Sequence, residues 1–335
     1  MILSKSPLRI SFAGGSTDIP SFYKKHNGAV LSTTINKYVY VGASIEMDEV
    51  YLTNYLNKHF GKEFNSDYQN PIDKEVLAYF NNINISIKSY SDISGRSGLG
   101  SSAAYTAALI STLLKFSNQN YTKEYLAQLT TTIEIDKLKM PVGKQDQYAT
   151  VYGGFNIIEF FKDDSVKVNP LHFDDDTIHT LESNLFLIDT NIRRDASIIL
   201  ASLNDSILEN SFVVKNLLEL KDLVFYLYDA INSKEFDKVG EILHKGWMKK
   251  KTLTVNTSNS AIDDLYSKSI KAGATGGKIL GAGGGGFLCL YVPQRNQKEF
   301  LIEMSNHKII DFSFENLGTT LITKDIQINE TSSIY

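Results

Sequence analysis

The sequence predicts an α+β protein of two domains. Its 335 residues exceed the usual size of a single hydrophobic core. Short β-rich runs broken by glycine and asparagine dominate the first hundred residues, whereas long runs with helical periodicity dominate the second half. We therefore expect an N-terminal domain over residues 1–184 with a mostly β opening, and an α+β C-terminal domain over residues 185–335.

The elements of the first half follow from local patterns. β-Branched and aromatic residues fill four strand-length runs, LRISFA, AVLSTTI, KYVYVGASI and ISIKSY. Helical periodicity begins at Ser102, and a second helix is expected from about Lys123 to Lys137. Strands are expected again at GGFNIIEFF and NLFLIDT, with the charged residues 162–177 between them interpreted as a turn and a surface loop.

The second half reads mainly as helices, over residues 195–231, 235–250 and 260–272. Their spacing gives two sets of apolar-face residues: Leu203, Ile207, Leu208 and Phe212, then Phe236, Val239, Ile242 and Leu243. A glycine cluster, the strand FLCLYV and a β-rich tail complete the expected α+β domain.

Composition favours a small-molecule ligand. A formal charge of −4 argues against a general nucleic-acid binder, which needs a basic surface to neutralise phosphates.

The N-terminus lacks an apolar signal segment and no run is long enough to span a bilayer, so we expect a cytoplasmic protein without membrane partners. Cys289, the only cysteine, is expected to be a buried thiol, and the six histidines lack zinc-site spacing.

Residues 95–102, GRSGLGSS, have the glycine spacing of a phosphate-binding P-loop. Ser101 stands where that motif requires lysine, so a Walker A site is rejected. Small residues before a helix can nevertheless bring backbone N–H groups close to an anion. The alternative is that Ser101 or Ser102 only caps the helix while the glycines form a turn.

Residues 281–286, GAGGGG, match the spacing of a dinucleotide-binding motif in the wrong context. A helix precedes them and a strand follows, the reverse of that motif, so dinucleotide binding is rejected. Consecutive glycines still indicate a close approach of the chain, either to a ligand or to protein backbone.

Four charged residues are candidates for chemistry. Glu134, near a helix end, and Asp146, after a connection containing Pro and Gly, could converge on one site, although a solvated Glu134 and a helix-capping Asp146 are the simpler interpretations. Arg9 and Asp18 look like opposite charges near one turn, for which a structural ion pair or an Asx-turn is the alternative.

Taken in order, these segments resemble the GHMP kinases, the superfamily of galactokinase, homoserine kinase, mevalonate kinase and phosphomevalonate kinase. SPLRISFAGGSTD resembles its substrate motif, SGRSGLGSSAA its phosphate loop and GGKILGAGGGG its C-terminal glycine motif. Ser94 and Arg96 replace the usual Pro and first Gly of the loop, and Leu280 stands where many members have Thr or Ser. The closest resemblance is to the D-glycero-D-manno-heptose 7-phosphate 1-kinases, followed by fucokinase domains.

The resemblance implies an N-terminal domain like domain 2 of ribosomal protein S5 and a ferredoxin-like C-terminal domain, with the active site between them. It implies catalytic roles for Asp146 and Arg9, and Mg²⁺ ligation by Ser102 and Glu134, with Asp136 as an alternative register. The loop that wraps the ATP phosphates would comprise Ser97, Gly98, Leu99, Gly100, Ser101, Ser102 and Ala103.

The same resemblance implies the acceptor site. Substrate-binding residues would be Gly15, Ser16, Thr17 and Asp18 in the sugar-contacting turn, together with Gly283 and Gly284. The 7-phosphate needs cations, for which the sequence offers Arg193 and Arg194 or Lys249, Lys250 and Lys251; a solvated charged surface is the alternative for each.

The implied activity is ATP- and Mg²⁺-dependent phosphorylation of the anomeric C1 hydroxyl of D-glycero-D-manno-heptose 7-phosphate, giving the 1,7-bisphosphate for nucleotide-activated heptose biosynthesis. Another sugar 1-kinase, acting on fucose or a hexose, is the alternative enzyme. A ligand-binding regulator that keeps the fold without the chemistry is the alternative from another class.

Overall fold

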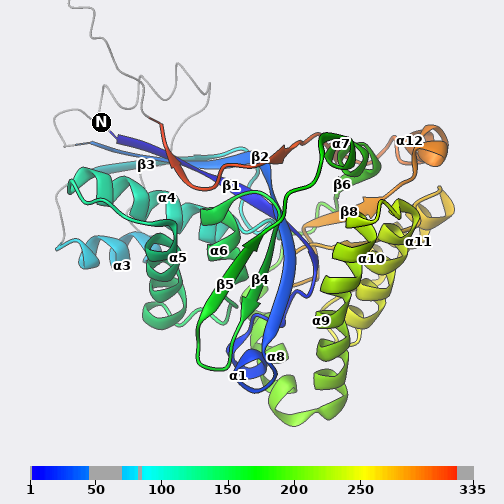
Figure 1. The fold of residues 1–335 in the computed structure, drawn as a ribbon, viewed down its shortest axis with the longest axis horizontal. Coiled ribbons are helices and arrows are strands. Elements are labelled where there is room, and N and C mark those ends of the chain that lie inside the picture. Colours follow the sequence, from blue (N-terminus) through cyan, green and yellow to red (C-terminus); the bar gives the residue numbers. More distant parts are fainter. Residues whose placement is uncertain (1, 45–69, 82–84, 323–335) are drawn as a thin grey trace, which may run out of the picture.

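The computed structural model describes residues 2–44, 70–81 and 85–322 (Figure 1). Among these, the first sheet is built around two long antiparallel strands, β1 (Ile2–Ala13) and β2 (Gly28–Ser44). Strands β4 (Asn156–Phe160) and β5 (Val166–Pro170) extend the sheet beyond β2, and β3 (Ser86–Ser91) pairs with the far end of β2. Two of the expected strands, AVLSTTI and KYVYVGASI, are therefore one strand, except that Ile45 lies outside the described residues.

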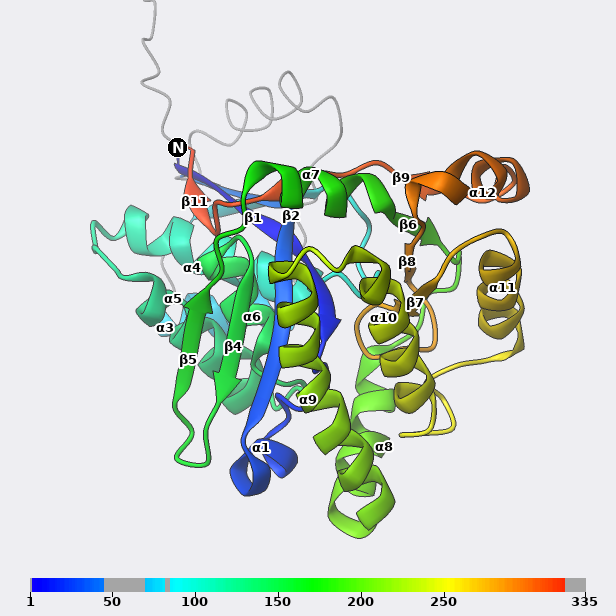
Figure 2. The ribbon, with the colours of Figure 1, turned by 45° about the vertical axis from the view of Figure 1, so that its right-hand side comes forward.

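Helices cover both faces of this sheet (Figures 1 and 2). On one side lie α3 (Pro71–Tyr79), α4 (Ser101–Phe116), α5 (Lys123–Thr131) and α6 (Gln145–Tyr152). A π-helical segment, η2 (Thr132–Lys137), continues α5, so the second expected helix is present with a change of helix type at its end. The short α1 (Pro20–His26) joins β1 to β2.

The second sheet has the order β7-β8-β6-β9 among the described residues. Its strands are β6 (Leu185–Asp189), β7 (Gly276–Ile279), β8 (Phe287–Tyr291) and β9 (Ile309–Ile310). The helices of this half are α7 (Asp175–Asn184), α8 (Ala196–Glu209), α9 (Ser211–Asn232), α10 (Phe236–Lys251), α11 (Ser260–Lys271), the 3-10 segment Gln294–Asn296 and α12 (Gln297–Glu303). The single helix expected over 195–231 is two, because Asn210 is extended and caps α9 through its side chain.

The two halves share packing. Residue 185, where we placed the domain boundary, begins β6, the first strand of the second sheet. The chain then returns to the first sheet at its end, because β10 (Phe314–Glu315) pairs with β2 and β11 (Thr320–Leu321) pairs with β1. One cluster of buried apolar side chains also runs through both halves, so the predicted division at 184/185 fully separates neither the two sheets nor the core.

The interpretation of residues 162–177 as a turn followed by a surface loop is right for the turn at residues 162–164 and wrong for the loop. All five residues of β5 pair with β4, and Asp174 then caps α7 by accepting a hydrogen bond from the N–H of Thr177 at 2.8 Å. The acidic run that looked like a surface loop is thus a capped helix start, where negative charge is favourable. Leu208 and Phe212, expected on apolar faces, are 56% and 55% exposed.

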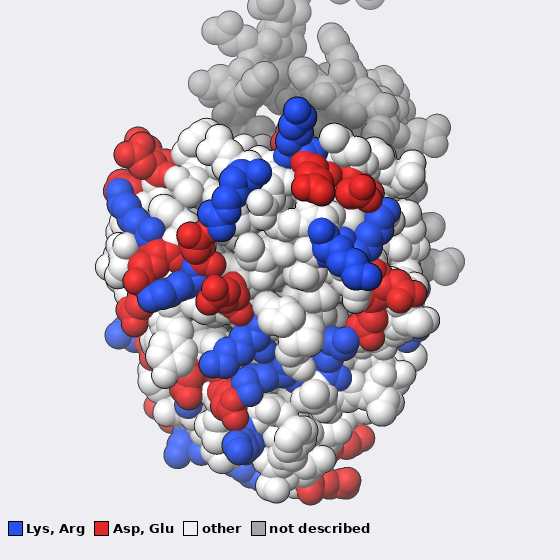
Figure 3. Space-filling view, turned by 90° about the vertical axis from the view of Figure 1, so that its right-hand side faces the viewer, with Lys and Arg blue, Asp and Glu red and all other residues white. Residues whose placement is uncertain are grey.

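Other expectations concern single residues and the surface. Cys289 is buried, and burial raises the pKa of its thiol to about 12. Basic and acidic side chains are interspersed on the face shown in Figure 3. Within the described ranges, no helix combines the length and apolar character needed to cross a bilayer.

Candidate active site

A cavity of about 320 Å³ lies between the two halves of the chain. The end of β1 and the turn after it line one side, with Arg9, Ser11 and Asp18. The loop before α4 and the loop before α6 complete the N-terminal wall, and residues 194–200, Lys250 and residues 280–283 contribute from the other half. Segments far apart in sequence therefore form one site.

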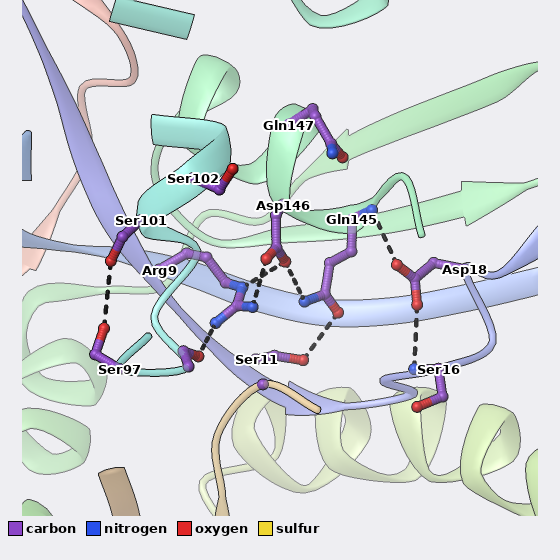
Figure 4. Close-up of polar contacts among 12 residues, drawn as sticks. Arg9, Ser11, Ser16, Asp18, Ser97, Ser101, Ser102, Gln145, Asp146 and Gln147 are labelled. Atoms are coloured by element: carbon purple, nitrogen blue, oxygen red, sulfur yellow. Dashed lines mark hydrogen bonds and ion pairs between the residues drawn. The ribbon is translucent and has the colours of Figure 1, made fainter. Parts of the chain in front are cut away.

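Asp146 and Arg9 form the central ion pair of this cavity (Figure 4). The Arg9 guanidinium donates through Nε to Oδ1 and through Nη2 to Oδ2 of Asp146, both at 2.7 Å, and Gln145 adds a third donor at 3.1 Å. Lys144 is the N-cap residue of α6, so the interpretation of Asp146 as the helix cap is wrong. Arg9 pairs with Asp146 and not with Asp18, the partner that proximity in sequence suggested.

Arg9 also fixes the glycine-rich loop. Its Nη1 donates to the Gly98 carbonyl at 2.6 Å, and its backbone N–H donates to the Leu99 carbonyl at 2.9 Å. Arg9, a buried residue of β1, thus fixes the position of the Asp146 carboxylate relative to the loop. Such fixed positions are needed where a carboxylate and an anion-binding loop must act on the same reaction.

The loop ends in an uncapped helix. The N-cap of α4 is Gly100, at φ +75°, with no side-chain cap, so Ser101 and Ser102 are not capping residues. Ser101 lies 3.3 Å from the Ser97 hydroxyl and Ser102 faces Glu134, which leaves the first N–H groups of α4 without a side-chain acceptor. Positive partial charge at such a helix start favours a phosphate group.

The second glycine cluster approaches the backbone of this loop. A Cβ at Gly281 would lie 2.7 Å from the Gly98 Cα, and one at Gly286 would lie 2.3 Å from the Ser97 carbonyl oxygen. The two glycine-rich segments therefore pack on each other, which answers what the consecutive glycines approach. Gly283 lines the cavity, whereas Gly284 packs against Arg194 and Ile199.

Glu134 lies in the π-helical segment, directly behind Ser102. Its Oε1 accepts hydrogen bonds from Ser102 at 2.6 Å and Thr106 at 3.0 Å, and its Oε2 accepts one from Gln147 at 2.6 Å. Burial raises the pKa of Glu134, and the three hydrogen bonds oppose that rise. Asp136, the alternative register, lines a different cavity with Tyr23 and Lys144.

The pair Ser102 and Glu134 fits a magnesium ion beside bound phosphates. A hydroxyl and a carboxylate are hard oxygen ligands, and Mg²⁺ usually takes only one or two protein ligands in addition to phosphates and water. Within the described residues, no group of three or more His, Cys, Asp or Glu side chains forms a metal site by itself. The donor set thus suits a metal that arrives with a nucleotide.

The turn after β1 presents Asp18 to the cavity. Its Oδ1 accepts from the Ser16 N–H and its Oδ2 from the Gln145 N–H, both at 3.1 Å. Burial, and then the nearby charge of Asp146, raise the pKa of Asp18. Gly15 and Ser16 also line the cavity, whereas the Thr17 hydroxyl donates to the Ala29 carbonyl and is fully buried.

The basic residues that could bind the 7-phosphate differ in whether they reach the cavity. Arg194 lines the cavity, but Arg193 does not, because its guanidinium forms two hydrogen bonds with Asp189, at 2.8 and 2.7 Å. Lys249 and Lys251 pair with Glu219 and Asp263, outside the cavity lining, whereas Lys250 is buried in the cavity wall.

Gln145 was not singled out from the sequence, and Arg96 was noted there as a departure from the family's loop. Gln145 accepts a hydrogen bond from Ser11 at 2.9 Å and donates to Asp146, so it links β1 to the carboxylate. Arg96 lines the cavity from the loop, at φ +60°, a conformation that glycine adopts more readily. The position of Gln145 directly before Asp146 was the one available signal.

Both halves of the chain match models of known protein families. The family model described as GHMP kinases N terminal domain matches residues 70–154, and that described as GHMP kinases C terminal matches residues 227–308. A D-glycero-alpha-D-manno-heptose 7-phosphate kinase of Campylobacter jejuni is 30% identical over 331 residues, covering 95% of this chain and 97% of the relative. A bifunctional fucokinase/GDP-fucose pyrophosphorylase of Arabidopsis thaliana is 26% identical over 92% of this chain and 32% of its own length.

The fold has solved counterparts as well. A D-glycero-D-manno-heptose 1-phosphate kinase from Bacteroides thetaiotaomicron superposes with a TM-score of 0.75 at 22% identity, covering 97% of this chain and 99% of the other. That likeness extends over both sheets and the connection between them.

Proposed function

The chain belongs to the GHMP kinases, and on that premise we propose that it is an ATP-dependent sugar kinase that phosphorylates the C1 hydroxyl of D-glycero-D-manno-heptose 7-phosphate. Membership supports ATP as the phosphoryl donor. The relative of 30% identity, which matches almost end to end, supports a sugar phosphate as the acceptor. The position of transfer and the identity of the heptose are the parts that the proposal adds.

One observation carries the proposal: the Arg9–Asp146 pair stands between the phosphate loop and Asp18. A kinase needs a carboxylate at the acceptor hydroxyl and backbone donors at the transferred phosphoryl group. Arg9 connects both, since the same guanidinium contacts Asp146 and the Gly98 carbonyl. Retention of these groups together also disfavours a regulator that has lost the chemistry.

The transfer is proposed as follows. The acceptor oxygen forms a bond to the γ-phosphorus of ATP while the bond from that phosphorus to the β,γ-bridging oxygen breaks, releasing ADP. Asp146 accepts the proton of the acceptor hydroxyl, and Arg9 keeps its carboxylate oriented. Positioning and charge stabilisation supply most of the rate, because little covalent chemistry is asked of the protein.

ATP is proposed to bind along residues 97–103, with its phosphates at the start of α4. The N–H groups of the first helical turn supply positive charge there in place of a P-loop lysine. Ser102 and Glu134 would hold Mg²⁺, which neutralises phosphate charge when bound.

Arg194 is the proposed partner of the 7-phosphate, together with Arg96 across the cavity. Both line the cavity, one from each half of the chain, and within the described residues neither forms an ion pair. A guanidinium donates two parallel hydrogen bonds to phosphate, which suits this task. Arg194→Ala is expected to raise KM for the sugar phosphate roughly 10-fold or more, whereas Arg295→Ala, on the surface, serves as the matched control.

A panel of acceptors tests the proposal. ADP release is measured with ATP, Mg²⁺ and each of heptose 7-phosphate, unphosphorylated heptose, fucose and galactose. The highest kcat/KM is expected with heptose 7-phosphate. If only fucose or a hexose supports turnover, that sugar replaces heptose 7-phosphate as the proposed acceptor. If no sugar stimulates ADP release, the proposed kinase activity is overturned.

A further inference from the structure

Lys250 places a cation inside the candidate active site, and the mechanism above leaves it without a role. It lies in the last turn of α10 and is only 5% exposed. Its ammonium group donates to the Gly281 carbonyl. That carbonyl is its one hydrogen-bond acceptor among the described residues, so two of its three N–H groups remain for a ligand.

Charged side chains from several elements lie near Lys250. Arg9 on β1, Asp18 in the turn after it and Asp146 on α6 act on it electrostatically. Lys278 on β7 is a further cation nearby, and its own ammonium donates to the carbonyls of Ser11 and Phe12. Burial, and then Arg9, lower the pKa of Lys250 to about 8, opposed by the two carboxylates.

Among the residues that the structure describes, no salt bridge compensates the buried charge of Lys250. Lys249 and Lys251, its neighbours in the chain, each pair with a carboxylate, whereas Lys250 forms no ion pair within the described residues. A buried cation without such a partner costs free energy, so its retention in a ligand cavity indicates that a ligand completes its contacts.

The Lys250 ammonium group lies at the proposed acceptor side of the cavity. A Cβ on Gly15, in the sugar-contacting turn, would lie 3.9 Å from the Lys250 Nζ, so the ammonium borders that turn. Asp18 in the same turn has both carboxylate oxygens held by backbone N–H groups, each with capacity to accept one more hydrogen bond.

We propose that Lys250 is an acceptor-binding residue: its ammonium donates a hydrogen bond to one oxygen of the sugar while Asp18 accepts one from a neighbouring hydroxyl. This assignment rests on the proposed function, because it requires a sugar acceptor. A fixed donor beside a fixed acceptor selects sugars whose adjacent oxygens match that order.

Lys250→Met tests the assignment, with Lys238→Met on the exposed part of the same helix as the matched control. Initial rates are measured with whichever sugar phosphate the wild type accepts best. We expect Lys250→Met to lower kcat/KM for that sugar roughly 10- to 100-fold, as for loss of a charge-assisted hydrogen bond, while KM for ATP changes less than about 2-fold. The control should match the wild type.

The pH profile separates binding from a structural role. As pH rises through about 8, the wild type should lose kcat/KM for the sugar because the ammonium loses its proton. Lys250→Met should lack that decline. Thermal unfolding checks that the variant is folded, and Lys250→Arg provides a second, charged variant that is expected to lose sugar affinity because of its different shape.

The outcomes are distinguishable. If the wild type is active and Lys250→Met has the same kcat/KM for the sugar, the proposed role of Lys250 is overturned and the proposed kinase activity stands. The same holds if Lys250→Met loses kcat/KM for ATP and for the sugar equally. A wild type without sugar-dependent ADP release would instead overturn the proposed function.

Discussion

The Asp146 carboxylate meets three N–H donors, two from Arg9 and one from Gln145, yet its side chain remains 32% exposed toward the cavity. These donors fix the orientation of the carboxylate. In Asp146→Asn the amide cannot accept a proton. We expect kcat to fall roughly 10²- to 10⁴-fold with little change in KM, measured by ADP release.

The control for this variant is Asp175→Asn, at an exposed position in the first turn of α7. A kcat for Asp146→Asn close to that of the control would show that Asp146 does not act as a base.

Glu134 permits a substitution that changes charge without disturbing packing. The Gln147 Oε1 atom is buried and has no hydrogen-bond partner, so a flipped Gln147 amide can accept from the new amide of Glu134→Gln. Stability should therefore hold, because Ser102 and Thr106 keep their acceptor. We expect the Mg²⁺ concentration for half-maximal activity to rise at least roughly 10-fold, as for weakening of a metal ligand.

Magnesium titrations of the wild type and the variant, with unfolding measured in parallel, check this expectation. An unchanged magnesium requirement in a folded variant would remove Glu134 from the metal site.

The pKa of Lys250 gives a stability prediction with a definite sign. Its folded-state pKa of about 8 lies below the ordinary 10.5, so between these values the unfolded chain binds more protons and wild-type stability rises with pH relative to Lys250→Met. The free-energy difference between the two proteins should shift by about 2.5 kcal/mol from pH 7 to pH 10, at 1.36 kcal/mol per pKa unit. Urea unfolding at both pH values measures it; a difference independent of pH would contradict the buried charge.

At the scale of elements, the contact between the two glycine-rich segments positions the loop before α4, which we propose binds the ATP phosphates. Gly281 has φ +72°, and its Cβ would lie 2.7 Å from the Gly98 Cα, so both conformation and space exclude a side chain. Gly281→Ala should cost roughly 1–3 kcal/mol of stability from strain and weaken ATP binding by displacing the loop. Calorimetric titration with ATP and urea unfolding measure the two effects.

Gly95→Ala is the matched control in this region, because a Cβ at Gly95 meets no atom within 4 Å. If Gly281→Ala bound ATP as the control does, the packing of the two segments would not determine nucleotide binding.

Sequence patterns predicted the elements whose periodicity is strong and local. The helix after the glycine loop, the strands LRISFA and ISIKSY and the helices after residue 195 are present, with shifted ends and one break. Residues 162–177 were misread because charge concealed a strand with an exposed face and a helix with an acidic first turn. Intrinsic composition does not distinguish such a helix start from a loop; the capping contact does.

The site was predictable in part, and mainly by resemblance. The order of the motifs predicted that Asp146, Arg9 and the loop lie at one cavity. Hydrogen bonds and ion pairs between residues distant in sequence could not be predicted from local sequence patterns. Arg193 and Arg194 are adjacent in sequence, yet Asp189 engages one and leaves the other at the cavity. Likewise, three consecutive lysines differ because helix rotation buries only Lys250.

At the scale of the whole molecule, the two halves share the cavity and the principal hydrophobic cluster. Leu8 of β1, Val224 of α9 and Tyr291 of β8 belong to the same buried cluster, so neither half can lose its packing without exposing the other. We expect a single calorimetric unfolding transition for the full chain. Saturation with ATP and Mg²⁺ at about 100 times Kd should stabilise it by about 2.7 kcal/mol.

Scanning calorimetry with and without the nucleotide measures both features. Two separated transitions would contradict the shared core, whether the nucleotide shifts one of them or both.

We propose that this cavity transfers a phosphoryl group to C1 of a heptose 7-phosphate. Phosphorus NMR of the product formed from ATP and D-glycero-D-manno-heptose 7-phosphate tests it most directly. We expect a second phosphate on the sugar whose phosphorus couples to the anomeric proton, formed by the wild type and not at a comparable rate by Asp146→Asn. A new phosphate that couples to any other ring proton, or a sugar recovered unchanged while other sugars react, would contradict it.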